Sequence, residues 1–117
     1  MGQLAEITSE QEFVAKVLKS PLPVLVDFWG DDCPPCLRML PRVEELARVY
    51  TGRVAVFKMN VFDAPAVPAD YGITSIPTFI LFRDGEPLEG FTGMMTVSQM
   101  AEMLDRHLVS ADDGRAD

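Results

Sequence analysis

The two cysteines of the chain, Cys33 and Cys36, are separated by two prolines in a single Cys-Pro-Pro-Cys motif. An apolar run precedes the motif and helical spacing follows it, so it is predicted to join a buried strand to the first turn of a helix. A helix N-terminus stabilises a thiolate, and only a thiolate attacks a disulfide. We therefore expect thiol–disulfide exchange. Cys33 would be exposed at the helix start and attack, and Cys36, one turn further in, would resolve the mixed disulfide.

Two other interpretations of the cysteine pair are a metal site and a structural or incidental pair. Zinc normally takes four ligands, and the only histidine in the sequence is His107. A disulfide between cysteines three residues apart closes too short a loop to remove much entropy from the unfolded chain. Two cysteines also cannot form the disulfide framework of a small secreted protein. We therefore expect no metal and favour redox chemistry.

The elements that must position the motif alternate between strand-like and helix-like stretches. Strands are predicted at Val24–Trp29 and at residues 53–61, 78–82 and 87–91. Helices are predicted at residues 9–20, 34–50 and 97–108, with one or two further helical turns within residues 63–71. Asp84-Gly85 is a hairpin signal. This order predicts an α/β fold in which a mixed central sheet has helices on both faces.

The charge of the chain excludes some classes of partner. The sequence has 18 acidic and 10 basic residues, a net charge of −8, which would repel a phosphate backbone, so no nucleic-acid partner is expected. No apolar run approaches the roughly 18 residues of a membrane span, so no membrane partner is expected either. Residues 1–13 contain three glutamates and no apolar core segment, unlike a secretory signal. We expect a cytoplasmic protein that acts as a monomer.

The length of 117 residues suits one domain. We place this domain at residues 1–109. Residues 110–117 contain no large apolar side chain. They are predicted to form a polar, disordered C-terminal tail.

Several separated motifs resemble those of the thioredoxin family. They are the run Val24–Trp29 followed by Cys33 and Cys36 and then by Pro41, the pair Ile76-Pro77, and Gly93. The resemblance covers nearly the whole chain, from about Leu4 to Leu108. A Cys-x-x-Cys motif alone would be weak evidence, but these residues at these spacings make the resemblance strong. It implies the thioredoxin fold, with a parallel β-α-β half joined to an antiparallel hairpin.

The resemblance also implies roles for individual residues. Cys33 matches the family's nucleophile and Cys36 its resolving thiol. Pro77 matches a cis-proline that faces the active disulfide, where the backbone of Ile76 could pair with an extended substrate segment. With Ile76, the residues Trp29 and Gly93 would form a flat apolar rim around Cys33.

Asp27 matches a buried carboxylate beneath the resolving cysteine, and Lys58 matches its basic partner. Burial should raise the pKa of this carboxyl group. Asp27 could then accept the proton of Cys36 as that thiol attacks. The alternative is a buried Asp27–Lys58 pair with only a structural role.

The sequence departs from the family pattern at four positions next to the nucleophile. Pro34 and Pro35 stand where thioredoxins usually have Gly-Pro, and Pro34 lacks an N–H that could help a thiolate. Asp32 stands where an aromatic residue is usual, and Asp31 precedes it. We expect the prolines to tune the redox potential. The two carboxylates would raise the pKa of Cys33 and select neutral or basic partners, unless they are merely a solvated acidic turn.

These observations together predict a protein disulfide reductase with no bound cofactor other than its redox-active disulfide. The resemblance implies that NADPH restores the dithiol indirectly, through a flavin-dependent, thioredoxin reductase-like donor. One alternative is a thiol oxidase or disulfide isomerase of the same fold, suggested by Pro34. Another is a redox-silent binding module that uses the same apolar rim.

Overall fold

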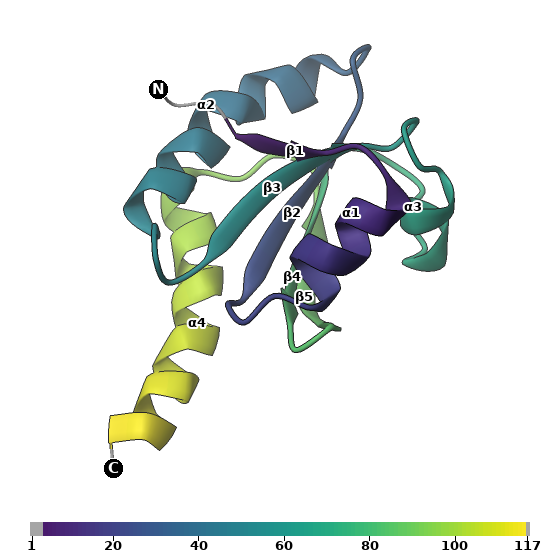
Figure 1. The fold of residues 1–117 in the computed structure, drawn as a ribbon. Helices are drawn as coiled ribbons and strands as arrows, with labels where there is room; N and C mark the ends of the chain where they lie inside the picture. Colours follow the sequence, from purple (N-terminus) through teal and green to yellow (C-terminus); the bar gives the residue numbers. More distant parts are fainter. Residues whose placement is uncertain (1–3, 117) are drawn as a thin grey trace.

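The computed structural model describes residues 4–116, with side chains for residues 4–108. The strands of this part form one mixed sheet in the order β1-β3-β2-β4-β5 (Figure 1). They are β1 (Ala5–Ile7), β2 (Val24–Trp29), β3 (Ala55–Asn60), β4 (Thr78–Arg83) and β5 (Glu86–Thr92). β1, β3 and β2 run parallel, whereas β4 and β5 are antiparallel to their neighbours. The fold expected from the resemblance is therefore present.

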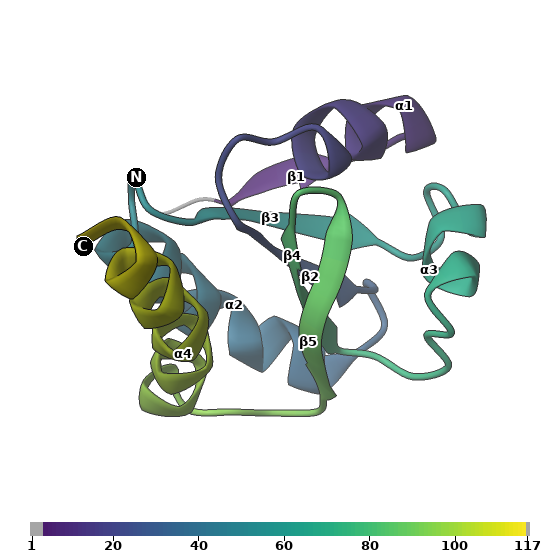
Figure 2. The same ribbon diagram turned by 90° about the horizontal axis from the view of Figure 1, so that it is seen from below.

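Helices cover both faces of the sheet (Figures 1 and 2). They are α1 (Glu10–Phe13), which continues into the π-helical segment η1 (Val14–Leu18), α2 (Pro34–Val49), α3 (Ala66–Asp70) and α4 (Val97–Ala116). Apolar residues of α2 and α4 form one core with the sheet, and those of α1, η1 and α3 form the other. Within the described range, no helix combines the length and apolar character that a membrane crossing requires.

Strand β2 lies in the middle of the sheet, and all six of its residues are buried. Leu25 belongs to the core under α2 and α4, whereas Val24 and Val26 belong to the core on the opposite face. Side chains alternate between the two faces of a strand. Asp27 and Trp29 therefore share the face of Leu25, and the sheet places both beneath the helix that follows the cysteines.

The hairpin signal at Asp84-Gly85 is confirmed. Both residues have positive φ, 53° and 80°, and they connect β4 to β5. Positive φ at two successive positions matches the right-handed twist of the flanking strands, and Asp-Gly tolerates it well. The hairpin brings Thr92 opposite Thr78, at the end of the sheet near the disulfide.

The prediction missed strand β1. It has only three residues, and Glu6 occupies its centre, so no apolar periodicity marks it. It is held by parallel pairing with β3, in which Glu6 lies opposite Lys58, and by the fully buried Ile7. The strand thus depends on tertiary contacts rather than on a local signal.

Helix α4 continues through Ala116, where the sequence analysis predicted a disordered tail after residue 109. Once a helix has formed, each added residue contributes a backbone hydrogen bond, so a polar segment can prolong it without core contacts. The side chains of residues 109–116, and Asp117 as a whole, lie outside the described residues. The domain boundary at residue 109 remains a prediction.

One side-chain hydrogen bond ties the short edge strand to the centre of the sheet. The indole nitrogen of Trp29 donates to Oε2 of Glu6 at 3.1 Å, so the bond spans from β2 to β1. We predict that Glu6→Ala lowers the free energy of unfolding by about 1.5 to 3 kcal/mol, the usual contribution of a hydrogen bond to a charged acceptor. Glu6→Gln keeps an acceptor oxygen and should cost less.

Equilibrium denaturation followed by the emission of Trp29, the only tryptophan of the chain, measures both variants. The emission maximum of folded Glu6→Ala should also shift, since the indole N–H loses its partner. Equal stability and emission in the parent and both variants would contradict a role for this bond.

Candidate active site

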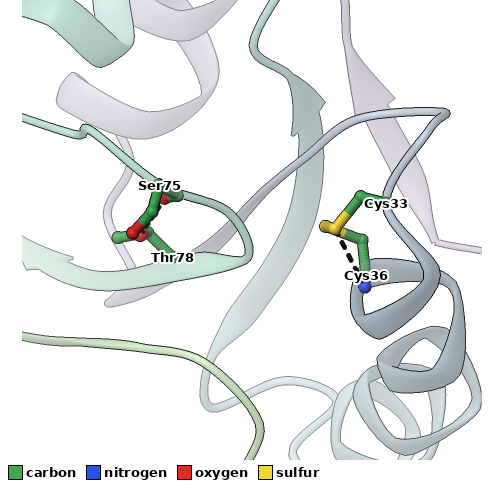
Figure 3. Close-up of a disulfide and its surroundings, with 4 residues drawn as sticks. All are labelled: Cys33, Cys36, Ser75 and Thr78. Atoms are coloured by element: carbon green, nitrogen blue, oxygen red, sulfur yellow. Dashed lines mark hydrogen bonds between the residues drawn. A yellow bond between two sulfur atoms is a disulfide. The ribbon is translucent and has the colours of Figure 1, made fainter.

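Cys33 and Cys36 form a disulfide at the first turn of α2 (Figure 3). Cys33 is the N-cap residue, and its Sγ accepts a hydrogen bond from the backbone N–H of Cys36 at 3.1 Å. Pro34 and Pro35 fill the first two helical positions and carry no N–H. The N–H of Cys36 is therefore the first amide hydrogen of the helix, and it points at the sulfur that the sequence analysis assigns to attack.

The two cysteine residues differ in solvent exposure less than expected. Cys36 is completely buried, and Cys33 is 6% exposed. Cys33 is the more accessible of the two, but the prediction that it is exposed is wrong. Its side chain packs in a cluster with Trp29 and Cys36, and Ile76 lies against that cluster. These contacts leave only a small part of Cys33 open to a partner.

The loop before β4 lies across from the disulfide. Figure 3 shows Ser75 on this loop and Thr78 at the start of β4, and Thr78 Oγ1 donates to the carbonyl of Ser75 at 2.7 Å. The Ile76–Pro77 bond between them is cis, as the resemblance implies. Gly93 has a φ of 100°, which favours glycine, and its N–H donates to the carbonyl of Pro77 at 2.9 Å. Gly93 thus adjoins Pro77, and Ile76 packs against the cluster that contains both cysteines.

Trp29 is packed among its neighbours and offers little open surface, because only 8% of the residue is exposed. Besides its bond to Glu6, its ring lies 4.8 Å from the Lys58 ammonium nitrogen, measured to the ring centroid. Such a cation over an aromatic face is attracted by the ring. The sequence analysis missed Glu6 as a neighbour of the site. No local sequence pattern indicates that Glu6 lies near the site. Its position follows only from the pairing of β1 with β3, in which Glu6 lies opposite Lys58.

Asp27 lies opposite Lys58 in the β2–β3 register and is completely buried. Neither of its carboxylate oxygens accepts a hydrogen bond from the part of the protein that the structure describes. Burial raises the pKa of Asp27 to about 7, and the charge of Lys58 opposes this rise. A buried carboxyl group with a pKa near neutral, on the sheet face that α2 covers, can take up or release a proton there.

Asp31 and Asp32 are both exposed in the turn before Cys33. No group of three histidine, cysteine or carboxylate side chains that could hold a metal ion occurs among the described residues. His107 instead lies 2.9 Å from Oε1 of Glu89 on β5. The candidate site therefore consists of the Cys33–Cys36 disulfide, the packed Trp29 ring, the buried carboxyl group of Asp27 and the loop that contains the cis-proline Pro77.

Comparison with known proteins places this arrangement in a family. The Thioredoxin family model matches residues 4–106. Thioredoxin 1 of Synechococcus elongatus is 40% identical over 105 residues, which are 90% of this chain and 98% of that protein. Thioredoxin of Rickettsia bellii is 38% identical over 90% of this chain and its own full length. The chloroplastic thioredoxin M-type of Spinacia oleracea is 40% identical over 86% of this chain and 54% of that protein.

The match includes the paired cysteines at the start of the helix. The structure shows their oxidised state, the disulfide that remains after the dithiol has donated two electrons and two protons to a client disulfide. The protein is a protein-disulfide oxidoreductase that reduces protein disulfides by dithiol exchange through Cys33 and Cys36. The chain belongs to the thioredoxin family.

Proposed function

We propose that Cys33 is the attacking thiol of this reductase. Its thiolate attacks one sulfur of a client disulfide, forms a mixed disulfide and releases the other client sulfur as a thiol. Cys36 then loses its proton, attacks Cys33 and releases the second client thiol. The client gains two electrons and two protons, and the protein returns to the Cys33–Cys36 disulfide.

The observation that carries this assignment is the N–H of Cys36 directed at Cys33 Sγ at 3.1 Å. A negative charge on Cys33 is stabilised by this amide and by the positive end of the 16-residue helix α2. Cys36 has no exposed surface, so a client cannot reach it first.

We predict that Cys36→Ser accumulates a mixed disulfide with an oxidised client protein, because the resolving thiol is absent. Cys33→Ser should trap nothing. Both variants should lose turnover in an insulin reduction assay. Non-reducing electrophoresis and mass spectrometry identify the trapped species. Trapping by Cys33→Ser alone would reverse the assignment, and full turnover in either variant would show that reduction does not need both thiols.

We further propose that Asp27 accepts the proton of Cys36, with Lys58 as its charge partner. A base works best when its pKa lies near the working pH, and the pKa of Asp27 lies at about 7. The strand register puts Asp27 on the face that α2 covers. Lys58 favours the ionised form that can act as a base.

Asp27→Asn should slow the resolving step at neutral pH by about 10- to 100-fold, the lower range for the loss of a positioned base. As the pH rises, hydroxide should deprotonate Cys36 in place of Asp27. The difference in rate between the unsubstituted protein and Asp27→Asn should therefore shrink above pH 8. Stopped-flow measurement of mixed-disulfide resolution between pH 5 and 9 tests this. An unchanged rate and pH profile would leave Asp27 with a structural role only.

The same substitution has a second measurable consequence, in stability. Folding raises the pKa of Asp27 from 3.8 to about 7, so ionising it costs the folded state on the order of 4 kcal/mol. In the unsubstituted protein (the parent), the contribution of Asp27 to the free energy of unfolding should be most favourable below pH 4. This contribution should be lost as the pH rises through 7. Denaturant unfolding at pH 5 and pH 9 should show a larger drop for the parent than for Asp27→Asn. Equal drops would show that the group is not desolvated.

We propose that the residues around the nucleophile set its reactivity. Pro34 and Pro35 leave one amide hydrogen for the sulfur, and Asp31 and Asp32 add negative charge in the preceding turn. We expect Asp32→Asn to lower the pKa of the Cys33 thiol in the reduced protein. The absorbance of the thiolate as a function of pH measures it, with Asp70→Asn, an exposed acid on α3, as the control. An unchanged pKa would indicate a merely solvated turn.

The remaining parts of the proposal concern electron supply and location. We propose that NADPH, through a thioredoxin reductase-like flavoprotein, restores the dithiol, and that the protein works as a cytoplasmic monomer. The similar thioredoxins include a chloroplastic one. Equilibration of the dithiol with glutathione measures its redox potential, which must be low enough for the proposed electron donor to restore the dithiol.

A further inference from the structure

Three charged side chains lie in one row across the sheet. Strand β3 separates β1 from β2 (Figure 1), and its residue Lys58 lies opposite Glu6 of β1 and opposite Asp27 of β2. Residues that are paired on neighbouring strands project from the same face of a sheet. Lys58 therefore has a carboxyl group on either side, and both groups can attract its single ammonium.

The Lys58 ammonium group does not bond to the nearer acid of the active site. Neither oxygen of Asp27 accepts a hydrogen bond from the part of the chain that the structure describes, although Lys58 is its direct neighbour in the register. The ammonium nitrogen lies instead 4.8 Å from the centroid of the Trp29 ring. An aromatic face attracts a cation, but a hydrogen bond to a carboxylate is generally stronger. The ring alone therefore does not explain the position of Lys58.

Glu6 supplies a second attraction on the other side of Lys58. Its Oε2 accepts the indole N–H of Trp29 at 3.1 Å. Since β3 lies between β2 and β1, this bond carries the Trp29 ring across β3, and the Lys58 ammonium lies over the ring. The negative charge of Glu6 is thus fixed at the edge of that ring. Glu6 is half-buried, so water and salt screen its charge less than that of a fully exposed acid.

The other described neighbours of Asp27 do not replace Lys58 as a charge partner. Its register partner on β4 is the apolar Phe79. The buried residues of α2, which covers this face, are Cys36, Met39, Val43 and Leu46, so the titratable groups on that side are Cys36 and, at the start of the helix, Cys33. In this setting burial raises the pKa of Asp27 to about 7. A hydrogen bond from Lys58 would stabilise the ionised form and lower the pKa.

We propose that Glu6 is a positioning residue of the exchange reaction. Its carboxylate holds Lys58 over the Trp29 ring and thereby prevents a hydrogen bond between Lys58 and Asp27. The carboxylate of Asp27 then has no bound partner to release when it accepts the proton of Cys36. Without the charge of Glu6, Lys58 turns towards Asp27 and makes it a weaker base. This inference rests on the proposed role of Asp27 as the base.

The test compares Glu6→Gln with the parent. Glutamine keeps an acceptor oxygen for the Trp29 indole but carries no charge, so the ring should stay in place while Lys58 is released. The pKa of Asp27 in the reduced protein is measured from the ¹³C resonance of its carboxyl carbon. The rate of mixed-disulfide resolution is measured by stopped flow between pH 5 and pH 8.

Glu86→Gln is the matched control for the loss of one negative charge from a strand. Glu86 is exposed at the start of β5. It lies six residues, roughly 20 Å of extended strand, from Thr92 at the end of β5 near the disulfide. Both the pKa of Asp27 and the resolution rate of this variant should match those of the parent.

We expect Glu6→Gln to lower the pKa of Asp27 by about one pH unit, because an ion pair with Lys58 favours the carboxylate. The midpoint of the pH–rate profile should fall with it. At pH 8 resolution should slow by about two- to threefold, because a weaker base accepts a proton less readily. Below pH 6 the variant should be faster than the parent, since more of its Asp27 is ionised. Its Trp29 emission should match that of the parent.

Lys58→Met shows whether Glu6 acts through the lysine. In a Lys58→Met background, the further substitution Glu6→Gln should change neither the pKa of Asp27 nor the pH–rate profile, because the group that transmits the effect is absent. An equal fall in the pKa with and without Lys58 would overturn the proposal. So would an unchanged pKa and profile in Glu6→Gln, or the same shift in Glu86→Gln.

The two levels of the argument fail separately. If Asp27→Asn resolves the mixed disulfide at the parent rate while Glu6→Gln still lowers the pKa of Asp27, the base role fails and the hold of Glu6 on Lys58 stands. If Asp27→Asn is slow while Glu6→Gln has the pKa and profile of the parent, the base role stands and the proposal for Glu6 fails.

Discussion

The account depends on one contact, the N–H of Cys36 directed at the sulfur of Cys33 at the first turn of α2. Two prolines occupy the intervening positions, so the chain reaches this contact through residues with a fixed φ and no amide hydrogens. The amide points at Cys33, and Cys36 is completely buried. Under the proposed assignment, this contact favours a negative charge on Cys33 and gives the cysteine pair its order of attack.

The rest of the fold keeps this turn in register with the sheet. β2 is buried along its whole length and ends just before the turn, so it fixes where α2 begins. The same strand carries Asp27 and Trp29 on the face beneath the helix, and β3 places Lys58 beside both. Burying Asp27 destabilises the folded protein at neutral and alkaline pH. The rest of the structure offsets this cost, which suits a buried acid with a chemical task.

Much of the site could be predicted from the sequence because it depends on local patterns. The strand–turn–helix around Cys33 follows from an apolar run and helical spacing, and the Asp84-Gly85 hairpin follows from turn chemistry. Features created by tertiary contacts could not be predicted. Strand β1 exists through pairing with β3, and the bond from Trp29 to Glu6 appears only when both strands are placed. Packing by Trp29 and Ile76 likewise explains why Cys33 is less exposed than its position at a helix start suggested.

The most direct test of the central claim is competitive alkylation of the reduced protein at pH 7 with a limiting amount of iodoacetamide, with peptide mapping to count the label on each cysteine. The account predicts that Cys33 is labelled at least ten times faster than Cys36, and that unfolding in denaturant abolishes the difference. Equal labelling in the folded protein, or preferential labelling of Cys36, would contradict it.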